Sequence, residues 1–460
     1  MPDFIKDQEI FDSLEKGKEF SSEQLMAVIE KARTAEGLSI AETAALLQCQ
    51  DPEIEKKIFL AAREIKETIY GKRIVIFAPL YLSNHCTNNC LYCGYKIGNA
   101  LDRRRLELDE IGREAEILLG MGHKRIVVEV GEDAKNCPID YVVGAIEKIY
   151  ETKTSKGSIR RINVNIAATT VENYRLLKEA GIGTYILFQE TYHHETYQKM
   201  HLSGPKANYA YHLTAMDRAM EGGIDDVGVG VLFGLFDYRF EVLAMLKHAL
   251  HLEEKFGVGP HTVSVPRLRP ARDVSLENFP HLVSDHDFKK IVAIIRLAIP
   301  YTGLILSTRE EPAFRDEVIA LGVSQISAGS CTGVGGYNES LEGSSNPQFE
   351  VGDHRSPLEI IKSLCRSDYV PSYCTACYRQ GRTGDRFMVL AKSGEIGNVC
   401  LPNALLTFKE FIDDFGDPEL KEIGQKTIER QLEKIPNPQT RQATEEQLRQ
   451  LENGKRDLYF

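Results

Sequence analysis

The chain has 460 residues, of which 42% are hydrophobic, enough to bury at least one large core. Its 56 Lys and Arg residues against 67 Asp and Glu give a formal net charge of −11, which argues against a broad nucleic-acid-binding surface. No apolar run reaches the roughly 18–20 residues of a membrane span, and the acidic start Met1–Asp7 is unlike a secretory signal. We therefore expect a cytoplasmic protein that binds neither nucleic acid nor membranes.

Residues 1–71 are predicted to form a helical extension. Ser39 and Glu42 have the spacing of a capping box, and Pro52 can open a longer helix. The apolar positions that share one face of that helix are Ile58, Ala61, Ala62 and Ile65.

From residue 72 to residue 335, short β-branched runs alternate with amphipathic helices. The eight runs are Arg73–Phe77, Arg125–Val130, Ile162–Ile166, Thr184–Phe188, Val227–Phe233, Thr262–Val265, Leu304–Ser307 and Val323–Ser327. Near-continuous apolar strands that alternate with helices are typical of a parallel sheet covered on both faces. Eight such units predict an α/β fold, a closed (β/α)₈ barrel of the TIM type, with an open doubly wound sheet as the alternative.

The rest of the chain has a different composition. Residues 336–370 include a stretch rich in Gly, Ser and Asn, which predicts a linker. Residues 371–460 are charged and predict a mostly helical domain, which carries the second of two cysteine groups. In a reducing compartment, clustered cysteines more often hold metal than form disulfides.

The first cysteine group follows the first predicted strand. Cys86, Cys90 and Cys93 have the spacing C-x₃-C-x₂-C, on a loop at the face of a barrel where active sites lie. Three thiolates on a short loop can each bind one iron of a 4Fe–4S cube and leave the fourth iron without a protein ligand. A structural zinc loop is the alternative, with His85 as its fourth ligand.

With the aromatic Tyr92 before Cys93, this motif resembles that of the radical S-adenosylmethionine (SAM) superfamily. The resemblance implies that SAM chelates the open iron, and that one electron from the cluster cleaves SAM to a 5′-deoxyadenosyl radical. Gly131 and Glu132 resemble the end of the family's Gly-Gly-Glu motif, which binds the SAM amino group, although Val130 replaces the first glycine.

Two further residues follow from the same resemblance. It suggests Arg218 as a partner of the SAM carboxylate, and Glu190, after the fourth strand, as a partner of the SAM ribose or of that arginine. A surface helix charge is the alternative for Arg218, and a structural ion pair is the alternative for Glu190.

The second cysteine group comprises Cys374, Cys377 and Cys400, with the spacing C-x₂-C-x₂₂-C. By itself this spacing fits either a zinc knuckle without its fourth ligand or an iron–sulfur cluster. In a chain that already carries a cluster motif, a second 4Fe–4S cluster with an open iron is the better hypothesis.

Together, the first motif, the barrel and the terminal cysteines make the whole chain resemble the radical SAM tyrosine lyases that mature FeFe hydrogenase. The segments Gly259–Arg267 and Leu306–Glu310 also resemble the related thiazole-pathway tyrosine lyase, but the terminal cysteines do not. The resemblance implies that the radical takes hydrogen from the amino group of L-tyrosine, and that the Cα–Cβ bond then breaks to give p-cresol and dehydroglycine.

The same resemblance assigns the second cluster a separate task. The cluster would hold an additional iron through a free cysteine, and it would convert dehydroglycine to carbon monoxide and cyanide. The product would be an iron–carbonyl–cyanide unit for the hydrogenase. An electron donor and the other hydrogenase maturation proteins are the partners that this implies.

Three residues at strand ends are further site candidates. His261, at the start of the sixth strand, is a candidate ligand of the additional iron, because a neutral imidazole suits Fe(II); a structural histidine is the alternative. Arg309 ends the seventh strand, and its guanidinium matches an amino-acid carboxylate, unless it pairs with Glu310 or the next glutamate. Ser330 follows the eighth strand and is expected to line the same pocket.

Two other functions compete with this hypothesis. The thiazole-pathway enzyme, a 2-iminoacetate synthase, would release dehydroglycine as its product and has no need of the terminal cysteines. A non-catalytic iron–sulfur scaffold would not need an eight-stranded barrel with arginine and glutamate at its strand ends.

Overall fold

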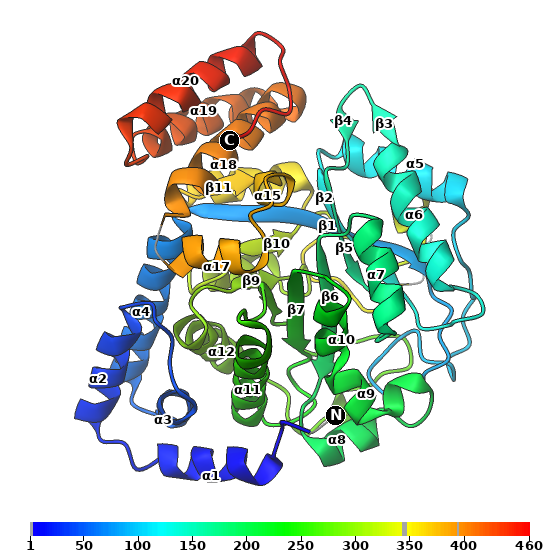
Figure 1. The fold of residues 1–460 in the computed structure, drawn as a ribbon, viewed down its shortest axis with the longest axis vertical. Coiled ribbons are helices and arrows are strands. Elements are labelled where there is room, and N and C mark those ends of the chain that lie inside the picture. The colour runs from blue at the N-terminus through cyan, green and yellow to red at the C-terminus, as the bar shows by residue number, and fades with distance from the viewer. Residues whose placement is uncertain (1–2, 343–346, 393–394) are drawn as a thin grey trace.

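The computed structural model describes residues 3–342, 347–392 and 395–460, and a closed parallel barrel lies at its centre (Figure 1). The barrel strands are β1 (Arg73–Ser83), β2 (Arg125–Val130), β5 (Arg161–Asn165), β6 (Thr184–Glu190), β7 (Asp226–Val231), β8 (Thr262–Ser264), β9 (Gly303–Leu306) and β10 (Gln325–Ser327). They follow one another around the barrel, and β10 pairs with β1 to close it. The predicted (β/α)₈ barrel is therefore confirmed, and the open sheet is excluded.

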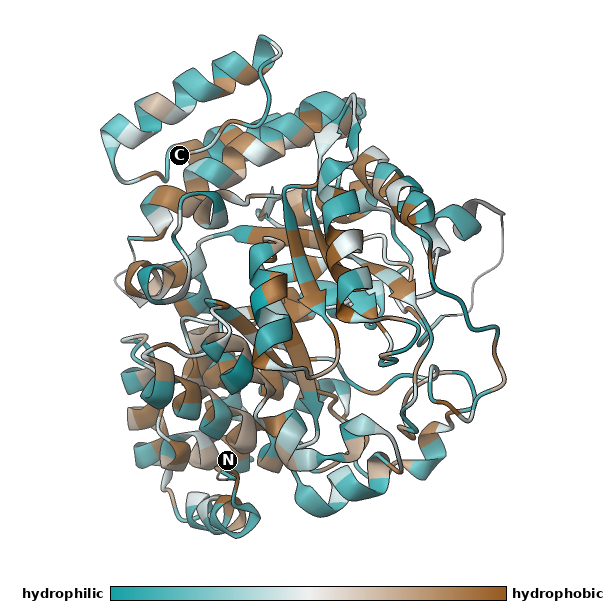
Figure 2. Cartoon of the chain, turned by 45° about the vertical axis from the view of Figure 1, so that its right-hand side comes forward, coloured by the Kyte–Doolittle hydropathy of each residue, from teal (hydrophilic) through white to brown (hydrophobic). Residues whose placement is uncertain are grey.

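Helices surround the barrel strands because those strands are apolar on both faces. In β7, for example, all six residues are buried. Figure 2 shows the hydrophobic strands at the centre and hydrophilic residues on the outer helices. The surrounding helices are α5 (Leu108–Gly120), α6 (Ile139–Glu151), α7 (Val171–Glu179), α8 (His194–Met200), α9 (Tyr209–Leu213), α10 (Ala215–Glu221), α11 (Tyr238–Phe256), α12 (Asp285–Ala298) and α13 (Pro312–Ile319).

The N-terminal extension consists of α1 (Asp7–Gly17), α2 (Ser22–Ala32), α3 (Ile40–Gln48) and α4 (Pro52–Tyr70), as expected. Ser39 and Glu42 form the predicted capping box at the start of α3. The predicted apolar face of α4 is fully buried, and α4 packs against α12. This contact fixes the extension to one side of the barrel (Figure 1).

The segment 336–370, expected as a linker, contains two helices, α14 (Gly336–Glu342) and α15 (Pro357–Arg366); residues 343–346 lie outside the described part. Helix α15 has a capping box at Ser356 and buries Ile360, Ile361 and Leu364. A short strand, β11 (Val370–Ser372), then pairs in parallel with the first residues of β1. The three-residue β11 has a central proline, and it leads the chain to the N-terminal end of the barrel just before Cys374.

The C-terminal part is mostly helical, as predicted. It consists of α16 (Ala376–Arg379), α17 (Gly384–Lys392), α18 (Gly397–Phe415), α19 (Pro418–Leu432) and α20 (Pro438–Glu452). Helix α18 carries Cys400 and packs against β11 and α19. None of the helices among the described residues combines the length and apolar character that a membrane crossing requires.

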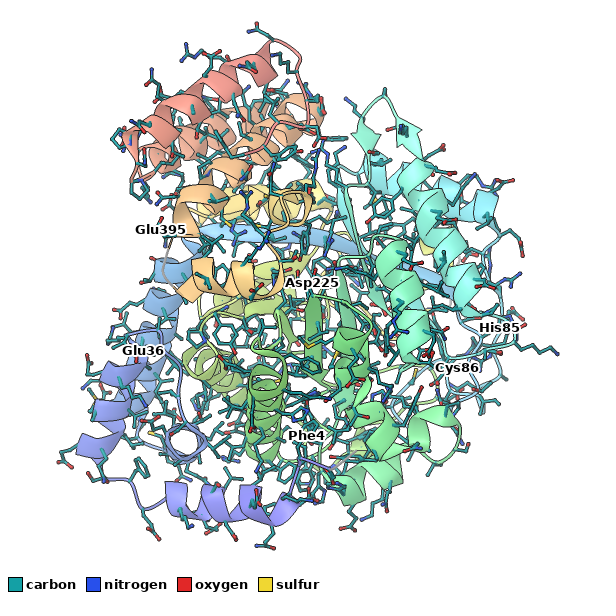
Figure 3. All side chains as sticks on the ribbon, in the orientation of Figure 1. Phe4, Glu36, His85, Cys86, Asp225 and Glu395 are labelled. Carbon is teal, nitrogen blue, oxygen red and sulfur yellow. The ribbon has the colours of Figure 1, made fainter. Side chains whose placement is uncertain are left out.

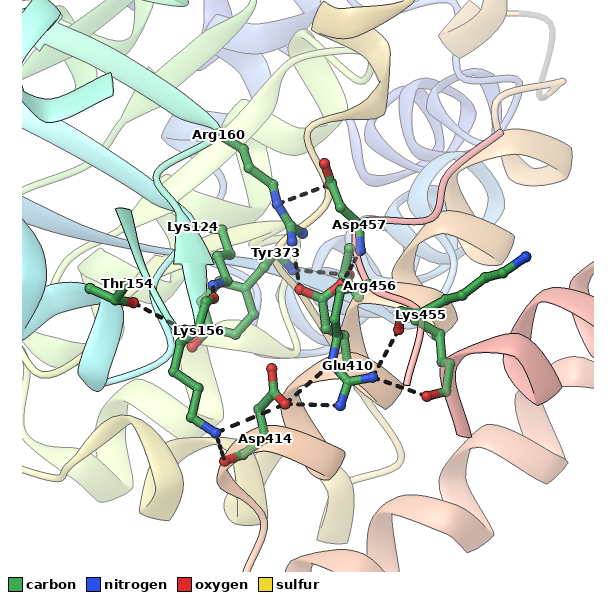
Figure 4. A network of polar contacts seen from close by, with 12 residues as sticks. Lys124, Thr154, Lys156, Arg160, Tyr373, Glu410, Asp414, Lys455, Arg456 and Asp457 are labelled. Atoms are coloured by element: carbon green, nitrogen blue, oxygen red, sulfur yellow. Dashed lines mark hydrogen bonds and ion pairs between the residues drawn. The ribbon is translucent and has the colours of Figure 1, made fainter. Parts of the chain in front are cut away.

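A network of ion pairs joins α18 to the barrel (Figure 4). The Arg160 guanidinium, just before β5, lies 2.5 Å from Glu410 Oε1 and 2.9 Å from Asp457 Oδ1. The Arg160 and Glu410 side chains are 9% and 6% exposed, so either charge without the other would be costly. The Lys156 ammonium also donates to the main-chain oxygen of Asp414 at 3.1 Å. These contacts hold the cysteine-bearing helix α18 against the N-terminal end of the barrel.

Candidate functional site

A cavity of about 230 Å³ lies at the C-terminal ends of the barrel strands. We call it the upper cavity. It brings together nine of the predicted site residues, namely Cys86, Cys90, Tyr92, Cys93, Gly131, Glu132, Glu190, Arg309 and Ser330. In Figure 3, His85 and Cys86 lie at the edge of the molecule, far from the C-terminal helices.

The first cysteine loop is fixed by the segment that follows α8. The Asn89 amide donates to Ser203 O at 3.0 Å, and the Leu91 amide donates to Met200 O at 2.9 Å. The Tyr92 hydroxyl lies 2.8 Å from His201 Nε2. Because His201 Nδ1 lies 2.8 Å from the carbonyl of residue 197, Nδ1 carries the hydrogen and Nε2 accepts from Tyr92.

The end of β2 packs directly on this loop. A side chain at Gly131 would place its Cβ only 2.3 Å from the main-chain oxygen of His85, so the close approach requires glycine. The Thr87 amide donates to Glu132 O at 2.8 Å, and Asn88 Nδ2 donates to Glu132 Oε2 at 2.6 Å. The predicted motif therefore clamps the cysteine loop against the barrel.

Glu190 forms an ion pair with a residue that sequence analysis did not single out. The Lys206 ammonium lies 2.8 Å from Glu190 Oε1, and both residues line the upper cavity. Glu190 has φ +68, a left-handed conformation that is unusual for a residue other than glycine. Burial alone would lower the pKa of Lys206, but Glu190 and the nearby Cys90 raise it above its usual value. Lys206 is therefore a fixed cation beside the first cysteine group.

Arg309 and Ser330 present unused hydrogen-bonding groups to the upper cavity. The Arg309 guanidinium stacks on Phe349, with its central carbon 3.3 Å from the ring centroid. Among the described residues, that guanidinium has no hydrogen-bond acceptor or carboxylate partner, so the alternative pair with Glu310 does not form. Ser330 Oγ is buried and also lacks a partner within the described part of the chain.

Glu129 is a second residue that sequence analysis did not single out. It precedes the Gly131–Glu132 pair and lines the upper cavity beside Asn165, whose side chain donates a hydrogen bond to it. Burial raises the pKa of Glu129 to about 8, although the Asn165 hydrogen bond and Arg309 oppose this shift. Side chains alternate between the two faces of a strand, so Glu129 and Val127 of β2 lie on the same face, inside the barrel. This alternation is the sequence signal that could have identified Glu129 as a site residue.

Arg218 does not line the upper cavity. Its guanidinium is buried in α10 and donates to Thr169 O at 2.8 Å, to Tyr211 O at 2.7 Å and to Thr214 Oγ1 at 2.9 Å. These contacts place Arg218 in the packing of α9 and α10 against the barrel. Lys206, and not Arg218, is the cation that lines the cavity beside Glu190.

A second, smaller cavity of about 40 Å³ lies at the opposite, N-terminal end of the barrel. We call it the lower cavity. Cys374, Cys377 and His261 line it, and Cys400 is hydrogen-bonded to Cys377. This hydrogen bond and the neighbouring Arg73 lower the pKa of Cys377. Strand β11 and helix α18 thus bring the second cysteine group together at the N-terminal end of the barrel.

His261 faces the second cysteine group from the start of β8. Its Nε2 lies 3.1 Å from the Tyr378 hydroxyl, and its Nδ1 lies 3.5 Å from Asp226 Oδ1. Burial lowers the pKa of His261, although Asp226 opposes this, so the imidazole is neutral at pH 7. A neutral imidazole is the form that binds iron.

Several buried polar atoms around the lower cavity have no hydrogen-bond partner in the described structure, which is unusual for a folded protein. They are Arg73 Nε, Arg125 Nε, Asp226 Oδ2, His261 Nδ1, Thr262 Oγ1 and Ser324 Oγ. No three His, Cys, Asp or Glu side chains among the described residues converge as ligands of one metal ion. Three thiols, positive guanidinium groups and unsatisfied polar atoms fit a bound iron–sulfur cluster, in which each thiolate takes a different iron.

The two cavities are neighbours along the inside of the barrel. Val75 lines the lower cavity, and Phe77, two residues further along β1, lines the upper one. In β9 and β10 the same relation holds for Gly303 and Ile305, and for Gln325 and Ser327. Successive inward-facing positions of the same strands therefore line the two cavities.

Comparison with known proteins agrees with this architecture. Residues 80–249 match the radical SAM superfamily, and residues 264–370 match the biotin and thiamin synthesis associated domain. The chain is 31% identical to 2-iminoacetate synthase of Escherichia coli (strain K12) over 349 residues, which cover 75% of this chain and 89% of the relative.

Two solved structures are similar to the chain over nearly all of its length. The crystal structure of HydG, a maturase of FeFe hydrogenase, is 62% identical, covers 100% of both chains and superposes with a TM-score of 0.98. The FeFe-hydrogenase maturase HydG from Carboxydothermus hydrogenoformans is 43% identical, covers 96% of this chain and 97% of its own, and has a TM-score of 0.84. The chain therefore belongs to the radical SAM superfamily and, within it, to the family of the FeFe-hydrogenase maturase HydG.

Proposed function

We propose that this protein is a radical SAM lyase that cleaves the Cα–Cβ bond of L-tyrosine to p-cresol and dehydroglycine, and that it works in the maturation of FeFe hydrogenase. The observation that carries the proposal is the placement of two cysteine groups at two cavities of one barrel, in a chain similar over its whole length to HydG. The relatives named 2-iminoacetate synthase support the same cleavage of tyrosine.

The upper cavity suits SAM. Cys86, Cys90 and Cys93 would hold a 4Fe–4S cluster, which with SAM bound would supply the 5′-deoxyadenosyl radical. Two of the chain's own residues would orient the cofactor. Glu132, beside the cysteine loop, would bind the SAM amino group, and the Lys206 ammonium would bind the SAM carboxylate. Lys206 takes this role in place of Arg218, whose guanidinium is occupied by main-chain oxygens.

The substrate would bind in the same cavity, at Arg309 and Ser330. Arg309 holds a free, planar guanidinium that can bind the tyrosine carboxylate through two parallel hydrogen bonds. Ser330 Oγ, which lacks a partner in the described structure, can take part in binding the amino or carboxylate group. Stacking on Phe349 fixes the plane of the guanidinium before the substrate arrives.

We expect Arg309→Lys to weaken the use of tyrosine while the first cysteine group keeps its cluster. Lysine retains the charge but loses the second hydrogen bond and the stacking on Phe349, at a cost of about 1.5–3 kcal/mol. The KM for tyrosine should therefore rise by roughly 10- to 150-fold. The check is p-cresol formation against tyrosine concentration, with iron content measured beside it. An unchanged KM would assign the substrate carboxylate to another residue.

The lower cavity is the proposed site of the second half of the chemistry. Cys374, Cys377 and Cys400 would hold a second 4Fe–4S cluster, and His261 with a free cysteine would bind an additional iron. Both cavities lie inside the same barrel, so the two-carbon fragment formed in the upper cavity would pass to the lower one within one protein. There it would yield the carbon monoxide and cyanide of an iron–carbonyl–cyanide unit.

The remaining parts of the proposal concern the setting of the reaction. An electron donor and the other hydrogenase maturation proteins are its partners. We place the protein in the cytoplasm, because none of the ten cysteines is in a disulfide, as expected in a reducing compartment.

The test is the complete reaction with anaerobically purified protein. Supplied with tyrosine, SAM and a reductant, the protein should form p-cresol together with carbon monoxide and cyanide, and it should contain two clusters by iron and sulfide analysis. Formation of p-cresol with release of dehydroglycine alone would favour the thiazole-pathway enzyme. Absence of SAM cleavage from the cluster-loaded protein would favour a scaffold.

A further inference from the structure

We propose that Glu129 is a further catalytic residue, whose carboxylate accepts a proton from the ammonium group of the substrate amino acid before hydrogen is abstracted from that nitrogen. The inference rests on the proposed function, since it assigns a step to the same upper cavity.

The position of Glu129 follows from the register of three neighbouring strands. Tyr81 in β1 pairs with Glu129 in β2, which pairs with Asn165 in β5. All three side chains line the upper cavity, whereas Val128, the residue before Glu129, is fully buried on the other face of the strand. The carboxylate therefore faces the space in which the substrate binds.

Glu129 is the carboxylate of this cavity that has neither an ion-pair partner among the described residues nor a role in SAM binding in the proposed function. Glu132 is held by Asn88 at 2.6 Å beside the cysteine loop, where the proposed function assigns it to SAM, and Glu190 is held by the Lys206 ammonium at 2.8 Å. Glu129 accepts a hydrogen bond from Asn165, and no cation among the described residues lies within ion-pair distance of it. Glu129 is thus the carboxylate of this cavity that is available to accept a proton from the substrate.

Arg309 links Glu129 to the substrate. The guanidinium is close enough to Glu129 to influence its charge. An amino acid whose carboxylate binds Arg309 carries its ammonium group on the adjacent carbon, so the ammonium lies near the carboxylate that faces the same space. An ammonium group also stabilises a nearby carboxylate, which favours this orientation.

The groups around Glu129 suit it to proton transfer near neutral pH. Burial raises its pKa to about 8, Arg309 lowers it, and Glu190 raises it. Tyr81 and Tyr95 are also close, but burial raises the pKa of both phenols well above 10, so they stay neutral. A base is most effective when its pKa lies near the working pH and near that of the group it deprotonates.

The step balances without any further reactant. The N–H bond of the ammonium breaks heterolytically, its electron pair stays on nitrogen, and an O–H bond forms on Glu129. The products are a neutral amine and a carboxylic acid. Removal of a hydrogen atom from the neutral amine leaves an uncharged nitrogen radical. Removal of a hydrogen atom from the ammonium group would leave a nitrogen radical that carries a positive charge, which is less favourable.

The first experiment is the pH dependence of kcat/KM for p-cresol formation in the wild type, in Glu129→Gln and in Glu129→Asp. In the wild type, kcat/KM should rise towards pH 8. The Glu129 carboxylate is the active form, and it is lost as the pH falls through the pKa of Glu129, which is about 8. Glu129→Gln should be on the order of 10²-fold slower at pH 7. Its rate should continue to rise about tenfold per pH unit until the free ammonium loses its own proton. Glu129→Asp should restore the shape of the wild-type profile.

The second experiment does not depend on turnover. Tyrosine is titrated by calorimetry into the SAM-loaded protein without reductant, at pH 7, in two buffers of different ionisation enthalpy. The wild type should release close to one proton when tyrosine binds. Before binding, Glu129 is protonated and the tyrosine nitrogen is an ammonium group; after binding, these two groups together hold one proton fewer. Glu129→Gln should release close to none.

Tyrosine-independent cleavage of SAM in each variant reports on the first cluster and normalises the rates. The proposal is overturned if Glu129→Gln keeps the wild-type rate and pH profile, or if it releases the same proton on binding tyrosine. It is also overturned if the variant loses SAM cleavage together with p-cresol, since Glu129 would then belong to the SAM site. If the wild type itself formed no p-cresol, the proposed function would fail instead.

Discussion

Replacing Cys86, Cys90 or Cys93 by alanine should abolish the cleavage of SAM and, with it, all p-cresol. The three thiols line one cavity at the C-terminal end of the barrel, and each would hold a different iron of the cube. Removal of one thiolate would take away one of the cluster's protein ligands, so the cluster would be lost or would no longer bind SAM. The measurements are iron content and 5′-deoxyadenosine formed in the presence of a reductant.

Cys137→Ala is the matched control for these variants. Cys137 lies near Cys86, in the loop after β2, but it does not line the upper cavity. It should keep the iron content and the rate of SAM cleavage of the wild type. Near-normal formation of 5′-deoxyadenosine by any of the three alanine variants would contradict the radical SAM mechanism for this site.

The double variant Cys374→Ser/Cys377→Ser should separate the two halves of the reaction. Its upper cavity is unchanged, because neither cysteine contributes to it, so p-cresol should form within about twofold of the wild-type rate. The iron-bound carbonyl and cyanide should be absent, because the additional iron would have no cluster to attach to. Chromatography of p-cresol and infrared detection of iron-bound carbonyl and cyanide measure the two outcomes.

His261→Ala should also lower the yield of iron-bound carbonyl and cyanide while p-cresol still forms, but the loss should be smaller than in the double cysteine variant. It would remove one ligand of the additional iron and leave the three thiols in place. Cys365→Ala provides the control, since this buried thiol of α15 does not line the lower cavity. If the folded double variant lost p-cresol as completely as Cys86→Ala, the division of labour between the two cavities would be wrong. If it still assembled the iron–carbonyl–cyanide unit, the terminal cysteines would be structural.

Local patterns in the sequence were enough to predict the barrel and its two cysteine groups. The eight barrel strands are apolar and short, and such runs between amphipathic helices have few alternatives to a covered parallel sheet. The spacing of Cys86, Cys90 and Cys93 lies within one loop, so it is independent of the rest of the fold. The capping box of Ser39 and Glu42 is local in the same way.

The position of the second cysteine group depended on tertiary structure. Strand β11 has three residues with a proline at the centre, and its sequence alone has no strand signal. It exists because the first residues of β1 extend beyond β2 and offer free main-chain groups for pairing. That pairing places Cys374 at the N-terminal end of the barrel. The buried contact of Arg160 with Glu410 places α18 beside it.

The choice among charged residues also depended on contacts between distant segments. Arg218 and Lys206 both follow Glu190 in sequence, but main-chain oxygens occupy the guanidinium of Arg218, while Lys206 reaches Glu190. Strand alternation indicates that Glu129 points into the barrel. Whether it is paired there depends on side chains from β1, β5 and the end of β9, far away in the sequence. The sequence by itself therefore determined the fold class and the two cysteine groups. Only the tertiary structure decided which charged groups remain free to bind substrate, because pairing between distant side chains is settled when the strands come together.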